Sequence, residues 1–248
     1  MSGIEFVKFL KEDEHFFVVD KPAKLAVHPS DMCRDRRTLL QLVRNKGGGE
    51  HVYPVHRLDK PVSGPILFAR SSEACQKLQS QFIEGKVEKH YVAIVRGWTE
   101  DSGIIDQPLK KHENGNMQEC RTEYDCIKKI EIDKPFGKHK TVRYSFLRMT
   151  PVTGRFHQLR RHCRDIAHPI MGDTTDGDSH QNRFFREEFQ IRRLMLHCCF
   201  LGFDHPVTGE RINTYLGPDK ELMSLFEKLN LDQAYKDLTE PWNAELSV

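Results

Sequence analysis

Four short stretches of the chain combine charged, imidazole and aromatic side chains whose types can support chemistry. They cover residues 18–29, 56–69, 87–97 and 153–162. In the second stretch, Asp59 stands between Arg57 and Lys60, where an expected strand gives way to a loop. A cation within about 4–6 Å typically lowers an aspartate pKa by roughly 1–3 units, so this carboxylate is expected to be ionised. Ionisation suits a nucleophile, whereas a surface salt bridge at a turn is the simpler alternative for Asp59 taken alone.

A basic run overlaps the fourth stretch and continues into the expected helix. Arg155, Arg160, Arg161 and Arg164 fall within ten residues that contain no acid. The turn signal Thr153-Gly154 precedes an expected helix, whose first backbone N–H groups can bind phosphate together with these cations. A solvated basic helix face is the alternative. The formal net charge of the whole chain is only +2, so any nucleic-acid binding must depend on such local charge.

The third stretch carries Tyr91 within an expected strand, Val87–Val95. Tyr91 alternates with Ala93 and Val95, which is typical of an aromatic residue in a protein core. Alternatively, its ring is a platform on which an extruded nucleobase stacks. The local sequence leaves both interpretations open.

The thirteen histidines do not predict a metal site. His157 and His162 are five residues apart and His162 and His168 are six, whereas a zinc-binding pair on one helix face is four apart. No Cys-x₂-Cys motif is present, and the glycine run at 47–49 lacks the Lys-Ser/Thr of a phosphate-binding loop. We therefore expect no catalytic metal.

These side chains must be positioned by a fold that contains both strands and helices. Alternation and short apolar runs predict strands at Ile4–Leu10, Phe16–Asp20, Tyr53–Arg57, Ile66–Ala69, Val87–Val95, Cys120–Ile132, Thr141–Val152 and Leu194–Phe203. Helical spacing and capping residues predict helices from Thr38 to Gly47, from Ser72 to Gly85, over Phe156–Asp165 and over 219–237, with a polar loop at 99–118. Strands outnumber helices and pair mostly locally, so we expect an α+β fold with a mixed, mostly antiparallel sheet and peripheral helices.

Length and composition fit a single globular domain, residues 1–248, that can consist of two closely joined lobes. No run approaches the roughly 18 apolar residues that span a bilayer. The first residues lack the basic and apolar regions of a secretory signal. Seven cysteines, an odd number without regular spacing, argue against a disulfide framework. We therefore expect a cytoplasmic protein that does not bind membranes.

In their order and separations the motifs resemble one family, the pseudouridine synthases related to ribosomal large-subunit pseudouridine synthase A. The matching motifs are His56-Arg57-Leu58-Asp59 with Ser63-Gly64, Thr153-Gly154-Arg155-x-His157-Gln158-Leu159-Arg160, His168-Pro169-Ile170-x-Gly172-Asp173, Leu196-His197 and His205-Pro206-x-Thr208-Gly209-Glu210. They run from about residue 14 to about residue 216, nearly the whole chain. One departure is Val62, which stands where the family usually has threonine, so a loop hydrogen bond is in question.

The resemblance implies a pseudouridine synthase catalytic fold with a central cleft, and an enzyme that isomerises a uridine in RNA without a cofactor or metal. Asp59 is then the catalytic carboxylate, which attacks the sugar or abstracts a sugar proton, and Arg160 is its ion-pair partner. Tyr91 stacks against the target base and helps to remove the C5 proton, while Leu159 forms an apolar wall of the pocket. The expected RNA contacts are His56, Arg57, Arg155, His157 and Arg161, and of these Arg57 or His157 fills the space that the flipped base vacates.

The stretches Gly177-Asp178, Gln181–Arg183 and Arg192–His197 are similar to the branch of the family that modifies tRNA near the junction of acceptor and T stems. We therefore expect tRNA as the partner, with ribosomal RNA as the alternative and no obligate protein partner. Family members often carry an extra small RNA-binding domain before the catalytic core, and we expect that domain to be absent here. Two other classes stay open. One is a non-catalytic RNA-binding protein, and the other is a hydrolase with an aspartate nucleophile, which usually has a second carboxylate or a metal.

Overall fold

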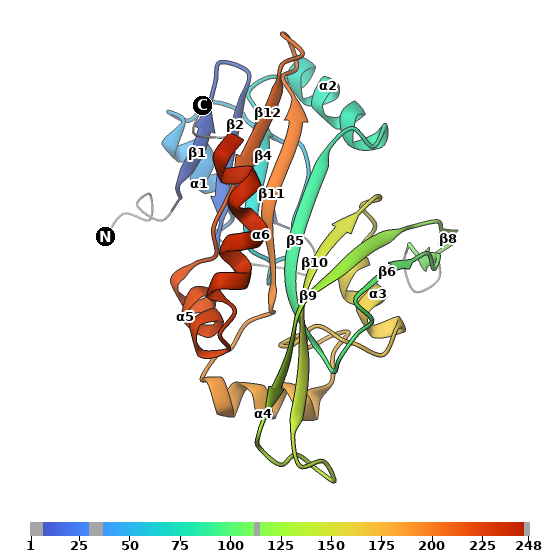
Figure 1. Cartoon of the computed structure of the whole chain (residues 1–248). Helices are drawn as coiled ribbons and strands as arrows, with labels where there is room; N and C mark the ends of the chain where they lie inside the picture. Colours follow the sequence, from blue (N-terminus) through green and yellow to red (C-terminus); the bar gives the residue numbers. More distant parts are fainter. Residues whose placement is uncertain (1–6, 30–36, 112–114, 246–248) are drawn as a thin grey trace. The chain divides into compact units, whose positions relative to one another are not determined.

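The computed structural model describes residues 7–29, 37–111 and 115–245 of the chain. It divides into two compact units, of which the first comprises Met1–Lys89 and Cys198–Gly217 and the second His90–His197 and Pro218–Val248. The chain passes from one unit to the other within strand β5 (Glu88–Arg96), within strand β11 (Leu196–Asp204) and before helix α5 (Lys220–Lys228) (Figure 1). Segments that are remote in the sequence therefore build each unit.

The first unit is built on an antiparallel sheet with the strand order β1-β2-β4-β3. Its strands are β1 (Phe9–Glu12), β2 (Phe16–Lys21), β3 (Tyr53–Pro54) and β4 (Gly64–Ala69), and its helices are α1 (Leu39–Lys46) and α2 (Ser72–Ile83). The hydroxyl of Ser71 accepts a hydrogen bond from the N–H of Ala74 and so satisfies one of the free donors at the start of α2. The antiparallel pair of β11 and β12 (Arg211–Tyr215) completes this unit.

The core of the first unit lies among strands β2, β4 and β11 and helix α2. Its buried members are Phe16, Val18, Val55, Leu67, Ala69, Ala74, Cys75, Leu78, Val87, Leu201 and Phe203. Alternate residues of β2 and β4 face this core, as the two-residue period of a strand requires. Close packing requires glycine at position 64, because a Cβ there would lie 2.4 Å from the Cβ of Cys198. The φ of Gly64, 147°, is also one that other residues rarely adopt.

In the second unit, strands β5, β10, β9 and β6 lie side by side in that order with antiparallel pairing. The bounds of its remaining strands are β6 (Ser102–Ile105), β7 (Leu109–Lys110), β8 (Met117–Gln118), β9 (Thr122–Ile132) and β10 (Val142–Pro151). Its helices, besides α5, are α3 (Gln158–Asp165), α4 (Ser179–Phe189) and α6 (Asp232–Glu245). Helix α3 packs against β9 and β10, and α6 packs against β9 and α5.

Aromatic pairs join the helices of the second unit to strand β10. Tyr144 meets Phe185 of α4 edge to face, with ring centroids 5.3 Å apart, and Phe146 meets Phe226 of α5 at 5.1 Å. All four side chains are buried. Edge-to-face contacts of this kind add roughly 0.5–1.5 kcal/mol to the burial of the rings. The two helices are thereby fixed on the strand that neighbours β5 and its Tyr91.

The mixed α+β class with antiparallel sheets is confirmed, and several elements differ from the sequence prediction. Helix α4 was not predicted, and Phe185 is its only buried residue. The expected loop at 99–118 contains the short strands β6, β7 and β8, and β12 was also missed. The single helix expected over 219–237 is two helices, since Asn230 adopts a left-handed φ of 54° between them. The first predicted strand lies partly outside the described residues, and β1 starts at Phe9.

No helix in the described part of the chain combines the length and the apolar character that a bilayer-spanning segment needs.

Candidate active site

Asp59 lies in the loop between β3 and β4 of the first unit and is half-buried. Its backbone carbonyl accepts from the N–H of Val62 at 3.0 Å, which closes a four-residue turn. The side chain of Val62 is buried, with 3% of its surface exposed. At the position where the family usually has threonine, apolar packing and the backbone therefore hold the loop.

Lys21, the last residue of β2, is fully buried. Such burial is rare for lysine and costly unless the charge has partners. The Nζ atom donates to the backbone carbonyls of Pro22 and Lys60, both at 3.1 Å, and to that of Val62 at 2.5 Å. Two of these carbonyls belong to the turn that follows Asp59. The buried ammonium group therefore anchors the turn and places a positive charge beside it.

His56 makes contacts within the first unit that account for its burial. Its Nε2 accepts from the N–H of Leu67 at 3.0 Å, and its ring stacks on that of Phe82, with centroids 4.8 Å apart. Burial and, second to it, the charge of Lys89 lower the pKa of His56 to about 3. The imidazole is therefore neutral, as it must be for Nε2 to accept a hydrogen bond. Contact between His56 and RNA stays a prediction.

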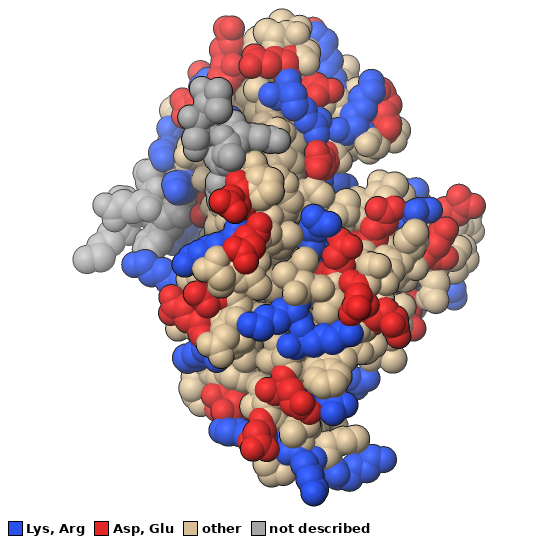
Figure 2. Space-filling view, in the orientation of Figure 1, with Lys and Arg blue, Asp and Glu red and all other residues tan. Residues whose placement is uncertain are grey.

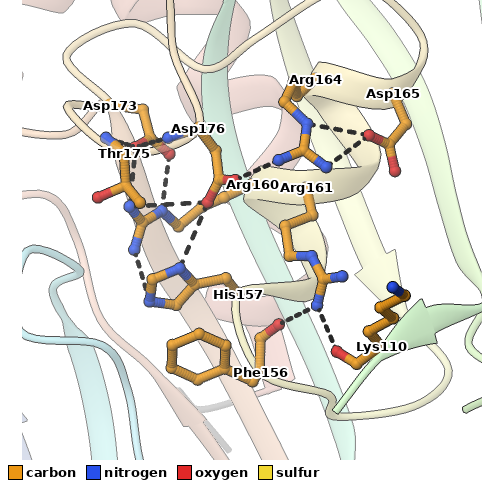
Figure 3. A network of polar contacts seen from close by, with 10 residues as sticks. All are labelled: Lys110, Phe156, His157, Arg160, Arg161, Arg164, Asp165, Asp173, Thr175 and Asp176. Carbon is orange, nitrogen blue, oxygen red and sulfur yellow. Dashed lines mark hydrogen bonds and ion pairs between the residues drawn. The ribbon is translucent and has the colours of Figure 1, made fainter. Parts of the chain in front are cut away.

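Arg160, in the first turn of α3, forms a two-point ion pair with Asp173 (Figure 3). Its Nε and Nη2 donate to the carboxylate oxygens at 2.7 and 2.8 Å, and the two side chains are only 5% and 1% exposed. Burial alone would raise the pKa of Asp173. Hydrogen bonds from Arg160 and from the N–H groups of Asp176 and Thr175, with the charge of Arg160, outweigh burial and lower that pKa. The guanidinium plane is thus held by an ionised carboxylate.

Helix α4 supports the backbone that carries Asp173. The side chain of Asn182 accepts from the N–H of Gly172 at 2.7 Å and donates to the carbonyl of Asp173 at 2.6 Å. Gly172 has a φ of 77°, and a Cβ there would lie 1.9 Å from a backbone oxygen, so glycine is required. The helix that the sequence prediction missed therefore positions the partner of Arg160.

His157 links Arg160 to a second carboxylate. The Nη1 of Arg160 lies 2.9 Å from His157 Nε2, and His157 Nδ1 lies 3.3 Å from an oxygen of Asp176. A guanidinium group can only donate, so Nε2 accepts and Nδ1 carries the proton that points to Asp176. Asp176 also accepts from Arg164 at 2.6 Å. Two of the four arginines of the basic run, Arg160 and Arg164, are thus paired with acids from a later part of the sequence.

Two other residues of the same motif shape the turn before α3. The Oε1 of buried Gln158 accepts from the hydroxyl of Thr153 at 2.7 Å and from the N–H of Arg155 at 3.0 Å. Its Nε2 donates to the carbonyl of Arg121 and to the hydroxyl of Thr122, both at 3.0 Å. These contacts tie the turn to β9, so Thr153 and Gln158 have a structural explanation.

Tyr91 and Leu159 both lie in the second unit and are largely buried. Tyr91, on β5, is 9% exposed and pairs across the sheet with Met149 of β10. Leu159, on α3, is 7% exposed. Low exposure fits both a core residue and a wall of a substrate pocket. Base stacking by Tyr91 and the pocket role of Leu159 therefore stay predictions.

The remaining predicted RNA contacts are cations that reach the surface. Arg57 in the first unit and Arg155 in the second are exposed. Arg161 donates to the carbonyl of Lys110 at 2.8 Å, which holds its side chain along the surface beside α3. Over the face seen in Figure 2, positive and negative side chains are interspersed without a broad area of one sign. This distribution agrees with the small net charge of the chain.

One cluster within the described ranges brings three potential metal ligands together, Asp13, His15 and His205, with ligand atoms within 4.8 Å of one another. His205 Nδ1 accepts from the N–H groups of Val207 and Thr208 at 3.1 and 3.0 Å. Its proton therefore resides on Nε2, which lies 3.4 Å from Asp13. A protonated Nε2 has no lone pair for a metal. The motif that begins at His205 is explained by the turn between β11 and β12.

The predicted site residues divide between the two units. His56, Arg57 and Asp59 belong to the first, whereas Tyr91, Arg155, His157, Leu159, Arg160 and Arg161 belong to the second. Within the second unit, His157 and Arg160 are in direct contact. The meeting of Asp59 with Arg160 and Tyr91 stays a prediction. Sequence reasoning missed the parts played by Lys21 and Asp173, although both stand in stretches that it had singled out.

Comparison with known proteins gives a consistent result. The family model for RNA pseudouridylate synthase matches residues 15–165. The chain is 40% identical to tRNA pseudouridine synthase C of Vibrio parahaemolyticus over 244 residues, which cover 94% of this chain and 98% of that protein. It is also 40% identical to tRNA pseudouridine synthase C of Pasteurella multocida, over 91% of this chain and 97% of the other. The solved structure of human RNA pseudouridylate synthase domain containing 1 has a TM-score of 0.69 and 24% identity, with 91% and 88% of the two chains covered, so the fold is shared.

Proposed function

The chain belongs to the RNA pseudouridylate synthase family, and on this premise we propose that it isomerises one uridine of tRNA to pseudouridine with Asp59 as the catalytic carboxylate. The relatives named tRNA pseudouridine synthase C support tRNA as the substrate, because the similarity extends over nearly the full length of both chains. The target uridine lies near the junction of the acceptor and T stems in this proposal. Ribosomal RNA is the alternative substrate.

The reaction breaks the N1–C1′ bond, turns the uracil and joins C5 to C1′. A proton leaves C5 and N1 gains one, so the base and the sugar keep all their heavy atoms. Asp59 attacks C1′ or abstracts a sugar proton, and both routes need the ionised carboxylate. Tyr91 stacks on the base and helps to remove the C5 proton. The base reaches these groups by flipping out of the folded RNA, at a cost of a few kcal/mol, and Arg57 or His157 fills its place.

The anchoring of the Asp59 loop is the observation that carries the assignment of this residue. The buried Lys21 ammonium group donates to two carbonyls of the turn after Asp59, which limits the movement of the loop. A catalytic group held in this way needs little reorganisation when substrate binds. The fixed guanidinium of Arg160 supports its role as the ion-pair partner, because its plane is already set by Asp173. Leu159 forms the apolar wall of the pocket.

Tritium release tests the proposed activity. The purified protein is incubated with total tRNA or with ribosomal RNA, each labelled with tritium at C5 of uridine. Release of tritium from tRNA with formation of pseudouridine is expected, and sequencing of the product locates the target. Release of tritium from ribosomal RNA but not from tRNA would show that ribosomal RNA is the substrate instead. Binding without release from any RNA would leave a non-catalytic RNA-binding protein, the second candidate.

We place this activity in the cytoplasm, as the composition of the chain predicts, and expect it to need no protein partner. Metal and cofactor independence are likewise expectations, which follow from a reaction that rearranges a single nucleotide. Activity that persists after dialysis against a chelator would support them. Activity that is lost on dialysis and returns only when a divalent cation is added would contradict them, provided that the tRNA itself stays folded without the cation.

A further inference from the structure

Phe156 exposes an aromatic ring at the margin of the polar network in Figure 3. This residue is 43% exposed, although burial of a phenylalanine is strongly favourable. Its ring stacks on that of His157, with centroids 3.8 Å apart and planes within 17° of parallel. In Figure 3 it lies beyond His157, on the side away from Asp173 and Thr175. One face of the ring is therefore covered by an imidazole, and much of the remainder is accessible.

The stacking of two successive side chains depends on the backbone of His157. Its φ of 52° and ψ of 28° are left-handed values, which are uncommon for a residue with a side chain. In an extended segment, successive side chains point to opposite sides. The left-handed turn instead brings the rings of Phe156 and His157 together. Strain of this kind persists only where the surroundings hold it.

The imidazole beneath Phe156 is held on both of its nitrogens. Arg160 donates to Nε2, and Nδ1 faces Asp176. The ring of His157 therefore cannot turn without breaking two polar contacts, and it presents a fixed plane to Phe156. An aromatic surface that is ordered in advance loses little conformational entropy when another ring stacks on it.

Two arginines, Arg155 and Arg161, lie close to Phe156. Arg155 precedes Phe156 in the chain and donates to the carbonyl of Glu119 at 3.3 Å, whereas the nearest acid in contact with the stacked rings is Asp176, which lies 3.3 Å from His157 Nδ1. Arg161 is bound to the carbonyls of Lys110 and, at 3.5 Å, of Phe156 (Figure 3). An exposed ring among cations offers a π face and phosphate contacts at the same place.

We infer that Phe156 is a stacking site for an unpaired nucleobase of the bound RNA, distinct from the uridine that is modified. Proteins recognise unpaired bases by stacking them on aromatic rings in basic surroundings. Every base has a π face, so Phe156 contributes affinity and register without selecting a base. The inference rests on the proposed function for the nature of its ligand, but it concerns a separate contact.

Affinity for unmodified tRNA tests the stacking site. Phe156→Ala is expected to weaken binding about ten-fold, the usual effect of losing one base–aromatic stack. Phe156→Trp retains a ring and should bind as the wild type does. Ile104→Ala is the matched control, because Ile104 is an apolar side chain of the second unit that is 57% exposed. Equal affinity of Phe156→Ala and the wild type would overturn the inference.

Phe156→Leu separates stacking from packing. Leucine still covers the imidazole of His157 but has no π face, so it should weaken tRNA binding as alanine does. Restored affinity in Phe156→Leu would show that Phe156 merely packs on His157 and would overturn the inference. A fall in kcat of Phe156→Ala at saturating tRNA, with unchanged affinity, would also overturn the inference. It would show that Phe156 supports Arg160 through His157 and does not bind RNA.

Tryptophan fluorescence gives a direct signature of the stack. In Phe156→Trp, tRNA should quench emission by more than it does in the wild type, whose two tryptophans are Trp98 and Trp242. Equal quenching in both proteins would contradict stacking. Tritium release by the wild type, measured on the same tRNA, keeps the two proposals apart. If the wild type releases tritium and Phe156→Ala binds tRNA as tightly as the wild type, only the stacking site is refuted. If Phe156→Ala binds tRNA more weakly but the wild type releases no tritium, only the enzymatic assignment is refuted.

Discussion

Polar partners account for the positions of Lys21 and Arg160, which are buried, and of His56, which is partly buried. Lys21 donates to backbone carbonyls, Arg160 to the carboxylate of Asp173, and His56 accepts from a backbone N–H. Burying such groups is unfavourable unless their hydrogen bonds are satisfied. The cost of removing one partner should therefore be large, and it can be measured for each residue separately.

Asp173→Asn tests the ion pair with Arg160. The substitution keeps the size of the side chain but removes the charge that binds the buried guanidinium at two points, so that only the more distant Asp176, at 4.0 Å, remains as a counter-charge. We expect the free energy of unfolding to fall by about 3 kcal/mol, as for other buried pairs that lose one member. Urea unfolding at pH 7 measures this change. The matched control is Glu123→Gln, which removes a half-exposed pair with Arg121 and should cost less than about 1 kcal/mol.

The activity of Asp173→Asn, measured where the variant is still folded, distinguishes positioning of Arg160 from support of the fold. Loss of kcat with little change in KM for tRNA is expected, because the guanidinium plane is no longer fixed. If kcat is unchanged in the folded variant, Asp173 serves stability alone.

His56 gives a prediction for the pH dependence of stability. Its pKa is about 3 in the folded protein and 6.5 for the ordinary side chain, so between these values only the unfolded chain binds the proton. The contribution of His56 is therefore complete above pH 6.5 and is lost as the pH falls toward 3. From pH 7 to pH 5 the loss is about 2 kcal/mol.

In His56→Gln this part of the pH dependence should disappear. Glutamine can still accept from the N–H of Leu67 but does not titrate. Unfolding free energies of both proteins at several pH values between 5 and 7 provide the comparison. Burial also lowers the pKa of His162, and this group affects the wild type and the variant equally. Parallel curves for the two proteins would refute the assignment.

At the level of elements, the loop with Asp59 depends on a residue of another strand. Lys21 ends β2, and its ammonium group reaches the turn that precedes β4. Lys21→Met keeps much of the buried volume but leaves the carbonyls of Lys60 and Val62 without this donor. We expect kcat to fall at least ten-fold, with a smaller change in KM, because a displaced catalytic group is costly.

Hydrogen exchange provides the second readout for Lys21→Met. The amide of Val62, which closes the turn on Asp59, should exchange faster in the variant than in the wild type. Amides of α3 in the second unit should be unaffected and act as an internal control. Unchanged exchange at Val62 together with unchanged kcat would show that Lys21 does not anchor the Asp59 loop.

Elements with a clear apolar pattern could be predicted from the sequence, and those without one could not. Strands β2, β4 and β5 have alternating or continuous apolar residues, and α2 has an apolar stripe with a serine at its start. Helix α4 and strand β12 each have a single buried residue, so neither presents the row of core-facing positions found in the predicted elements. The missed helix belongs to the surroundings of Arg160, because its Asn182 holds the backbone at Asp173.

For the whole molecule, the motifs predicted the family but not the contacts that each of their residues makes. His56, Thr153 and Gln158 stand in the family motifs and have structural contacts that explain them. The partners Lys21 and Asp173 were not identified, because a sequence does not show which side chains meet in space. Chain segments 1–89 and 198–217 form one unit and the rest forms the other, an interleaving that no local pattern reveals.

The central claim is that Asp59 performs chemistry on a uridine of tRNA. Tritium release from C5-labelled tRNA by Asp59→Asn, compared with the wild type in parallel with tRNA affinity, tests it most directly. Asparagine has the same shape but no charge, so release should be abolished while the dissociation constant for tRNA and the unfolding transition stay close to those of the wild type. Tritium release by the variant at the wild-type rate would contradict the account.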